Sequence, residues 1–211
     1  MAVEVVINGL PVAAEAHLIK GTTFVELRKM VDARGDTVTW YPPATVRVVT
    51  FPRITVDTDY RIPSRLTPRV LDRLLAGAGI LDGQGTVFTG AEAKYGGPNA
   101  LLMIAHAFLE SARGTSEYAR ERNNIYGIAA YDDDPDRAAR FESLADCVDY
   151  YAGWITRQWL HPWGDRWAGA PSLAAMNRGR ELADGSRLAY ATDPEWAQKI
   201  VNIANELLAL I

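Results

Sequence analysis

The chain has 211 residues, 48% of them hydrophobic and 23% charged, as expected for a globular protein of one or two domains. Its net charge of −4 lacks the basic excess typical of proteins whose main partner is nucleic acid, and no run approaches the roughly 18 apolar residues of a membrane-spanning helix. The single Cys147 excludes an internal disulfide framework and is expected to be a small buried residue, while His17, His106 and His161 lack metal-binding spacing, so we expect no metal or other cofactor.

The first 62 residues form a compositional block of their own. A β-branched run, Val3–Ile7, meets the turn signal Asn8-Gly9, and a helix is expected to begin at Thr22 or Thr23 and to end at Gly35. Further strands are expected at residues 37–40, 45–49 and 54–56. Residues 57–68 are rich in Pro, Ser and Thr and are interpreted as a linker. We therefore predict two domains, 1–62 and 63–211.

Helices dominate the second predicted domain. Thr67-Pro68 is a cap followed by proline at the first helical position, and Ser143 is expected to cap a long helix that ends near Trp159. A short polar helix is expected over residues 116–122, a small hairpin over 127–141 with its turn at 132–136, and a last helix from Asp193-Pro194. Residues 77–97 and 163–190 are glycine-rich or loop-rich and indicate no definite element.

The helix before Gly114 carries the most informative residue. One buried stripe is expected at Leu101, Ile104, Ala105, Phe108 and Ala112, which leaves Glu110 on another face in the last turn. The helix C-terminus and partial burial are both expected to raise the pKa of Glu110, as a general acid requires. The alternative is an ordinary solvated glutamate. No role is assigned to His106, which is expected on the helix surface.

The sequence around Glu110 resembles that of a known family. The sequence reads Leu109-Glu-Ser-Ala-Arg-Gly-Thr-Ser116, then Asn123-Asn-Ile-Tyr-Gly-Ile128. Pro171-Ser-Leu-Ala-Ala-Met-Asn177 and Tyr190-Ala-Thr-Asp-Pro-Glu-Trp-Ala197 follow in order. These motifs resemble the glucosaminidase domain of bacterial autolysins and flagellar wall hydrolases, glycoside hydrolase family seventy-three, over roughly residues 66–211. The resemblance implies an α+β fold: a mainly helical, lysozyme-like catalytic domain with a small β-hairpin lobe.

The same resemblance implies catalytic roles. It places the catalytic glutamate at Glu110 and suggests Asp132 as the second carboxylate that most glycosidases need. Asp132 lies in an Asp-rich stretch that also reads as an ordinary turn. Alternatively, the substrate's own acetamido group acts as the nucleophile. Tyr190 is expected to face the cleft near Glu110, or else to pack against the last helix.

Several residues are candidates for binding substrate. Asn123 and Asn124 either hold their loop by hydrogen bonds or contact acetamido groups. Tyr126 and Tyr131 are candidate sugar platforms, because aromatic faces pack against sugar C–H groups. Arg113 either meets a substrate carboxylate or is simply an exposed arginine.

The N-terminal block resembles the small stalk module found at the N-terminus of some copper amine oxidases and in Gram-positive surface proteins. The match rests on Val6–Gly9, Gly21–Arg28 and Gly35–Trp40. It implies a β-rich spacer or wall-targeting module with one helix and no copper site.

The sequence thus predicts a peptidoglycan hydrolase that cleaves the β-1,4 bond after N-acetylglucosamine, with glycan strands as partner and no nucleic acid, membrane span or obligate protein partner. A muramidase or lytic transglycosylase of the same fold is the alternative enzyme, and a non-catalytic wall-binding module the alternative from another class. An extracellular or wall location is expected although the chain starts without a visible signal peptide. Either a leader has been removed or release resembles that of phage lysins.

Overall fold

The computed structural model describes residues 4–7, 10–12, 39–41, 45–48, 53–129 and 138–210. The chain divides into two compact units, residues 1–53 with 208–211, and residues 54–207. The second unit therefore begins at Ile54, nine residues before the boundary that composition predicts. The reason is that Tyr60 is fully buried, and its backbone N–H donates to the Pro171 carbonyl at 2.7 Å.

The first unit contains a four-stranded sheet. Its strands are β1 (Glu4–Ile7), β2 (Leu10–Val12), β3 (Thr39–Tyr41) and β4 (Thr45–Val48), in the order β2-β1-β4-β3. β1 pairs antiparallel with β2 and parallel with β4, and Ile7 stands opposite Leu10. This register confirms strands on both sides of the Asn8-Gly9 signal. The helix expected near residues 22–35 lies outside the described residues, and the strand expected at 54–56 is absent from this described stretch, which forms turns.

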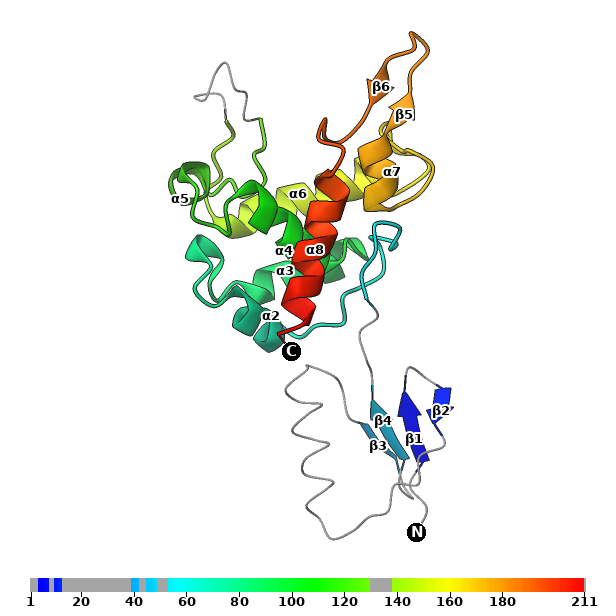
Figure 1. Ribbon diagram of the computed structural model, residues 1–211. Coiled ribbons are helices and arrows are strands. Elements are labelled where there is room, and N and C mark those ends of the chain that lie inside the picture. Colours follow the sequence, from blue (N-terminus) through cyan, green and yellow to red (C-terminus); the bar gives the residue numbers. More distant parts are fainter. Residues whose placement is uncertain are drawn as a thin grey trace. The chain divides into compact units, whose positions relative to one another are not determined.

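The second unit is mainly helical, as predicted (Figure 1). Its helices are α2 (Pro68–Leu75), α3 (Gly85–Tyr95), α4 (Ala100–Glu110), α5 (Glu117–Arg122), α6 (Leu144–Trp159), α7 (Leu173–Arg178) and α8 (Trp196–Leu208), with a 3-10 turn η1 (Gly79–Leu81). A two-stranded antiparallel sheet joins β5 (Arg180–Glu181) to β6 (Arg187–Leu188). None of the helices within the described residues is long and apolar enough to cross a membrane.

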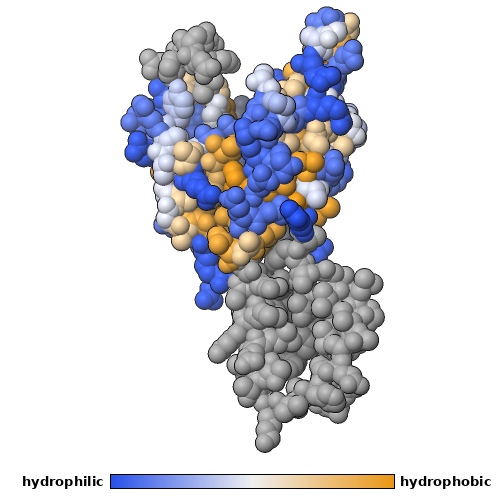
Figure 2. Space-filling model, viewed as in Figure 1, coloured by the Kyte–Doolittle hydropathy of each residue, from blue (hydrophilic) through white to orange (hydrophobic). Residues whose placement is uncertain are grey.

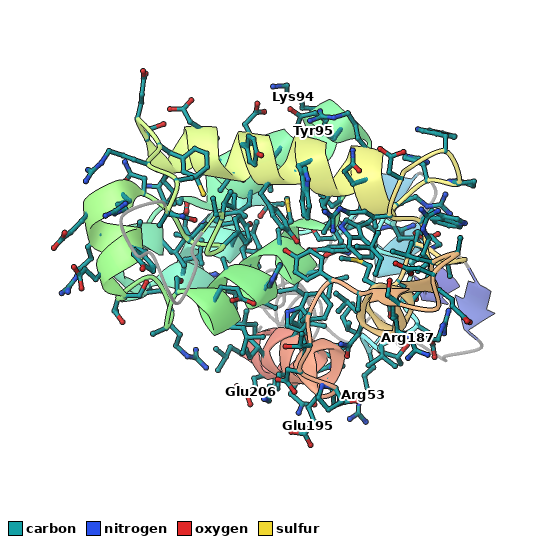
Figure 3. The ribbon with its side chains drawn as sticks, turned by 90° about the horizontal axis from the view of Figure 1, so that it is seen from above. Arg53, Lys94, Tyr95, Arg187, Glu195 and Glu206 are labelled. Atoms are coloured by element: carbon teal, nitrogen blue, oxygen red, sulfur yellow. The ribbon has the colours of Figure 1, made fainter. Side chains whose placement is uncertain are left out.

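Helix α4 lies at the centre of this unit. Every residue from Ala100 to Phe108 is buried, so the single stripe expected from the sequence is wrong. A helix that is apolar on all sides must be covered on all sides. Seen from above in Figure 3, α6 and α8 form opposite sides of the unit with α4 between them, and His106 of α4 contacts rings from both. His106 is consequently a buried core residue, which corrects its expected surface position.

A buried carboxylate fixes the start of α4. Glu92 of α3 accepts hydrogen bonds from the backbone N–H groups of Ser64 and Ala100, both at 2.7 Å. Asn99 caps the same helix by accepting from the Leu102 N–H at 3.1 Å. These acceptors satisfy N–H groups that have no partner within the helix. They tie α3, α4 and the segment before α2 together.

Some elements follow the sequence prediction and others do not. Thr67 and Ser143 cap α2 and α6 as expected, and Ser116 caps the expected short helix α5. Cys147 is fully buried, which raises the pKa of its thiol to about 12. Residues 77–97 and 163–190, where no element was predicted, contain α3, α7 and the β5–β6 sheet. The turn at residues 132–136 of the expected hairpin lies outside the described residues.

The outer face of α8 is polar. Hydrophilic residues cover α8 and the β5–β6 hairpin on the face shown in Figure 2, while hydrophobic side chains gather beside them. Glu195 and Glu206 lie along this outer edge in Figure 3, opposite the edge where Lys94 and Tyr95 lie beside α6. Trp196, Ile200, Ala204 and Leu207 of α8 are buried. The last helix is thus amphipathic, as its sequence predicts.

Candidate active site

A cavity of about 1060 Å³ opens beside the C-terminal end of α4. Its walls come from the end of α4, the middle and end of α6 and the segment after it, the segments before α6 and α8, and the first turn of α8. The lining residues are Leu109, Glu110, Tyr126, Gly127, Ile128, Ala129, Tyr150, Tyr151, Trp154, Trp159, Arg166, Tyr190, Ala191, Thr192, Asp193, Trp196 and Lys199. Aromatic rings beside the Glu110 carboxylate make a surface suited to sugars.

The turn after Glu110 explains the Glu-Ser-Ala-Arg-Gly-Thr-Ser motif. Ser111 is fully buried; its hydroxyl donates to the Ala107 carbonyl at 2.5 Å and accepts from the Gly114 N–H at 2.8 Å. Gly114 has φ +76°, and a Cβ there would lie 2.5 Å from the Ala78 carbonyl oxygen. Only glycine fits this conformation and this close approach. The motif therefore ends α4 sharply and leaves Glu110 at the mouth of the cavity.

Two side chains hold the Glu110 carboxylate. Its Oε1 atom lies 3.2 Å from His106 Nε2, one turn earlier on α4, and accepts from the Trp196 Nε1–H of α8 at 3.3 Å. The Glu110 side chain is 32% exposed, whereas the His106 side chain is 1% exposed. The carboxylate therefore faces the cavity while its supporting groups come from the core.

The pKa of Glu110 is lowered, which corrects the upward shift expected from the sequence. Burial raises this pKa, but the hydrogen bond and the charge of His106, together with the Trp196 hydrogen bond, outweigh it. These donors stabilise the charged form more than burial and the helix terminus destabilise it. In the free protein, Glu110 is therefore an ionised, hydrogen-bonded carboxylate.

Tyr190 lies in the cavity wall beside Glu110. Its ring stacks on Trp196, with centroids 4.6 Å apart, and meets His106 edge-on at 5.3 Å. Burial and the Glu110 charge raise the pKa of Tyr190 well above its ordinary value. Its hydroxyl consequently stays protonated and able to donate. Tyr190 combines both of its expected positions, at the cleft and against the last helix.

Asn123 and Asn124 hold their loop. Asn123 ends α5 with φ +52° and donates to the Phe141 carbonyl at 3.0 Å. Asn124 is 1% exposed; its side chain donates to the carbonyls of Ile128 and Ala139 and accepts from the Ile128 N–H. Neither residue lines the cavity, so these contacts favour the loop-holding alternative.

The remaining sequence candidates differ in position. Tyr126 lines the cavity, but it is 5% exposed and its ring face stacks on Tyr151 at 3.7 Å. Arg113 lies outside the cavity, near Glu206 at 3.5 Å and over the Phe108 ring. Tyr131 and Asp132 lie outside the described residues.

Sequence reasoning missed several lining residues. Arg166 lies over the rings of Trp154 and Trp159, about 6 Å from each centroid (6.0 and 5.8 Å). Lys199 pairs with Asp193 at 2.6 Å, whereas among the described residues no carboxylate pairs with Arg166. His106 could have been found from its i,i+4 spacing to Glu110, because such residues meet on a helix. Arg166 had no such local signal.

A comparison with family models gives one match that covers more than half of the chain. Residues 86–209 match the glucosaminidase family, described as mannosyl-glycoprotein endo-beta-N-acetylglucosaminidase. This range includes α4, the turn after it and the cavity-lining part of α8.

Curated relatives of the chain agree with this family match. The chain is 32% identical over 129 residues to a protein of Streptococcus pneumoniae serotype 4 named "Putative endo-beta-N-acetylglucosaminidase", covering 59% of this chain and 17% of that protein. It is 31% identical over 159 residues to the bifunctional autolysin of Staphylococcus aureus strain Mu50, covering 64% of this chain and 12% of that protein. The chain thus spans less than a fifth of the length of either relative.

Solved structures share the fold. A catalytic mutant of S. aureus autolysin E in complex with the disaccharide NAG-NAM superposes with a TM-score of 0.60 at 20% identity, covering 98% of this chain and 83% of that one. Another autolysin E structure gives a TM-score of 0.59 at 23% identity, over 72% and 70% of the two chains. With the family match over residues 86–209, these findings show that the chain belongs to the glucosaminidase family.

Proposed function

We propose that the chain is a peptidoglycan hydrolase, an endo-β-N-acetylglucosaminidase that cleaves the β-1,4 bond after N-acetylglucosamine. The observation that carries this proposal is the Glu110 carboxylate, held by His106 and Trp196 in an aromatic-lined cavity. Family membership supports the glycosidase chemistry. The names of the relatives, an endo-beta-N-acetylglucosaminidase and an autolysin, and the NAG-NAM complex of a structural neighbour support the substrate.

In the proposed reaction, Glu110 is the general acid. Its carboxyl protonates the glycosidic oxygen as the bond from that oxygen to the anomeric carbon breaks, and positive charge develops on the sugar ring. The Tyr190 hydroxyl, protonated beside Glu110, is placed to donate to an oxygen of the substrate or of the carboxylate. Trp154 and Tyr150 offer ring surface to the sugars. No metal or nucleotide is needed for these steps.

Arg166 is the proposed partner of a substrate carboxylate. It lines the cavity, and its guanidinium is fixed over two indole rings. Peptidoglycan differs from neutral chitin by the carboxylates of its lactyl and peptide groups, and a guanidinium recognises such groups well. This assignment moves to Arg166 the role that the sequence suggested for Arg113.

The second catalytic group is proposed to be either Asp132 or the substrate's acetamido oxygen. Glu110 and Asp193 are the carboxylates among the described lining residues. Asp193 accepts from the Glu195 N–H at 2.9 Å and pairs with Lys199. Its carboxylate is therefore already engaged in contacts at the start of α8. The variant Asp132→Asn distinguishes Asp132 from the acetamido oxygen, because participation by the acetamido group leaves turnover near the wild-type value.

The N-terminal unit is proposed to be a stalk-like spacer or wall-targeting module, and the protein to act outside the cell at the wall. A wall substrate requires the external location. The four-stranded sheet is compatible with such a module.

A zymogram tests the proposed activity. Wild-type protein is run beside Glu110→Gln in gels that contain cell walls. A clear zone for the wild type and a strongly reduced one for Glu110→Gln support the proposal. Equal zones mean that another group is the acid, and the absence of any zone with folded wild-type protein indicates a non-catalytic binding module.

A further inference from the structure

A tight loop after α6 brings Arg166 back to the wall of the cavity. The Arg166 N–H donates to the Gln158 carbonyl of α6 at 3.0 Å, and the Gly164 N–H donates to the His161 carbonyl at 2.9 Å. A Cβ on Gly164 would clash with the Gln158 carbonyl oxygen, so glycine is what lets the loop pass this close to the end of the helix. The backbone of Arg166 is therefore held at a fixed place beside α6.

Two indole rings of α6 then orient the Arg166 side chain. Its guanidinium carbon lies 6.0 Å from the Trp154 ring centroid and 5.8 Å from the Trp159 ring centroid, and all three residues line the cavity. Lys199, the other lysine or arginine among the described lining residues, is paired with Asp193 at 2.6 Å. No carboxylate in the described part of the chain pairs with Arg166. Its positive charge is thus left for a group that enters the cavity.

Aromatic rings connect this guanidinium to the candidate acid. The Tyr190 ring meets the same two indoles, with centroids 5.9 and 5.6 Å away, and stacks on Trp196 at 4.6 Å. Trp196 in turn donates to the Glu110 carboxylate. One aromatic wall therefore carries both charged groups, and a glycan strand that lies along this wall meets the acid and the guanidinium at two fixed places.

The chemistry of the strand makes such a fixed charge informative. Peptidoglycan alternates two sugars, and of these only N-acetylmuramic acid carries a lactyl group, whose carboxyl is either free or joined to the stem peptide. Moving the strand by one sugar exchanges the two sugars at every place in the cavity. The same move replaces the bond after N-acetylglucosamine at Glu110 by the bond after N-acetylmuramic acid. A cation that holds one lactyl group therefore selects the bond, however many sugars separate it from the acid.

We propose that Arg166 sets the register of the glycan strand by binding the lactyl group of one N-acetylmuramic acid, so that the bond after N-acetylglucosamine faces Glu110. This inference rests on the proposed function and names the residue that selects the bond. A guanidinium suits the task because its planar fork donates two parallel hydrogen bonds to a carboxylate. The two indoles beneath it restrict its motion, so it recognises a carboxylate at one place along the wall.

The reducing ends released from peptidoglycan test the proposal. Wild type, Arg166→Gln and Arg113→Gln are compared at equal concentrations of folded protein; Arg113→Gln is the matched control, because it removes the same charge outside the cavity. We expect the ratio of N-acetylglucosamine ends to N-acetylmuramic acid ends to fall about 10- to 100-fold in Arg166→Gln alone, the effect of losing a hydrogen bond between charged groups. The same ratio in Arg166→Gln and wild type, or an equal fall in Arg113→Gln, overturns the proposal.

A second measurement changes the substrate instead of the protein. An amidase removes the stem peptides, which leaves the lactyl groups as the carboxylates of the strand, and carbodiimide coupling to methylamine then neutralises them. We expect the kcat/KM of wild type to fall about 10- to 100-fold on the neutral strands, and Arg166→Gln to cleave acidic and neutral strands equally well. No fall for wild type, or an equal fall for both proteins, contradicts the proposal. Wild-type protein that releases no ends from any glycan is a different result, and it removes the proposed function itself.

Discussion

At Glu110, side-chain neighbours outweigh the position in the helix. A carboxylate in the last turn is disfavoured by roughly 0.3–1 kcal/mol, and this local effect led to the expected rise in pKa. The donors that reverse it come from one turn earlier, His106, and from 86 residues later, Trp196. The first could be inferred from spacing, but the second requires the fold.

Glu110→Gln is therefore expected to lower stability at neutral pH. The lowered pKa means that the ionised carboxylate contributes stability above its ordinary value of 4.5, and that this contribution is lost as the pH falls through the folded-state value. Melting temperatures of wild type and Glu110→Gln should differ at pH 7 and converge near pH 3. A Glu110→Gln variant as stable as the wild type at pH 7 would show that burial and the helix terminus outweigh the stabilisation of the carboxylate by His106 and Trp196.

Tyr190→Phe should reduce turnover with little effect on stability. The variant keeps the ring that stacks on Trp196 at 4.6 Å and removes only the hydroxyl near Glu110. A hydrogen bond to a charged group is worth about 1.5–3 kcal/mol, which corresponds to roughly 10- to 100-fold in kcat. Steady-state kinetics and a thermal melt separate the two effects; full activity with a lowered melting temperature would make Tyr190 a packing residue only.

At the scale of elements, capping chemistry is predictable and burial is not. Thr67, Ser116 and Ser143 each accept a hydrogen bond from an N–H three residues later, so the residue type alone marks these helix starts. Helix α3 was missed because Gly85 and Gly90 argue against a helix. Yet Gly85 is required where it stands: a Cβ there would lie 2.3 Å from the Pro68 carbonyl oxygen of α2. Such an approach between helices leaves no local pattern.

Glu92→Ala should destabilise the fold without direct effect on the chemistry. It leaves the Ser64 and Ala100 N–H groups without their acceptor at the start of α4. Unsatisfied buried donors cost about 1–3 kcal/mol each. Urea unfolding should show this loss, and Glu92→Gln, which retains an acceptor oxygen, should lose less. Equal stability of Glu92→Ala and wild type would show that water replaces the carboxylate.

At the scale of the whole molecule, the sequence predicted a mainly helical unit with one small β element and suggested Glu110 as the candidate acid, but it did not predict the cavity. The lining residues come from segments as distant as Leu109 and Lys199, and Arg166 and Trp159 carry no motif that marks them. Family resemblance supplied Tyr190 and the Asn123-Asn124 loop. The boundary at residue 62 was placed by composition, and composition does not reveal that Tyr60 fills the core.

Two fragments test the domain organisation. A chain that begins at Ile54 keeps Tyr60 and the hydrogen bonds of Ile54 with Asn205, so it should fold and cleave soluble glycan like the full chain. A chain that begins at Pro63 loses a fully buried tyrosine and should be less stable by about 3–5 kcal/mol, the usual cost of deleting a large core side chain. Thermal melts and activity on soluble glycan and on intact walls check this. Equal stability of the two fragments would place residues 54–62 outside the folding unit, and lower activity of the longer fragment on intact walls alone would support wall targeting.

The most direct test identifies the sugar at the newly formed reducing ends. Purified peptidoglycan is digested with wild type and with Glu110→Gln, the products are reduced with borohydride, and mass spectrometry identifies the terminal residue. We expect reduced N-acetylglucosamine from the wild type and a rate at least about 100-fold lower from Glu110→Gln, because a general acid contributes about 10²–10⁴ in rate. Terminal N-acetylmuramic acid, its anhydro form, or an undiminished rate from Glu110→Gln would contradict the account.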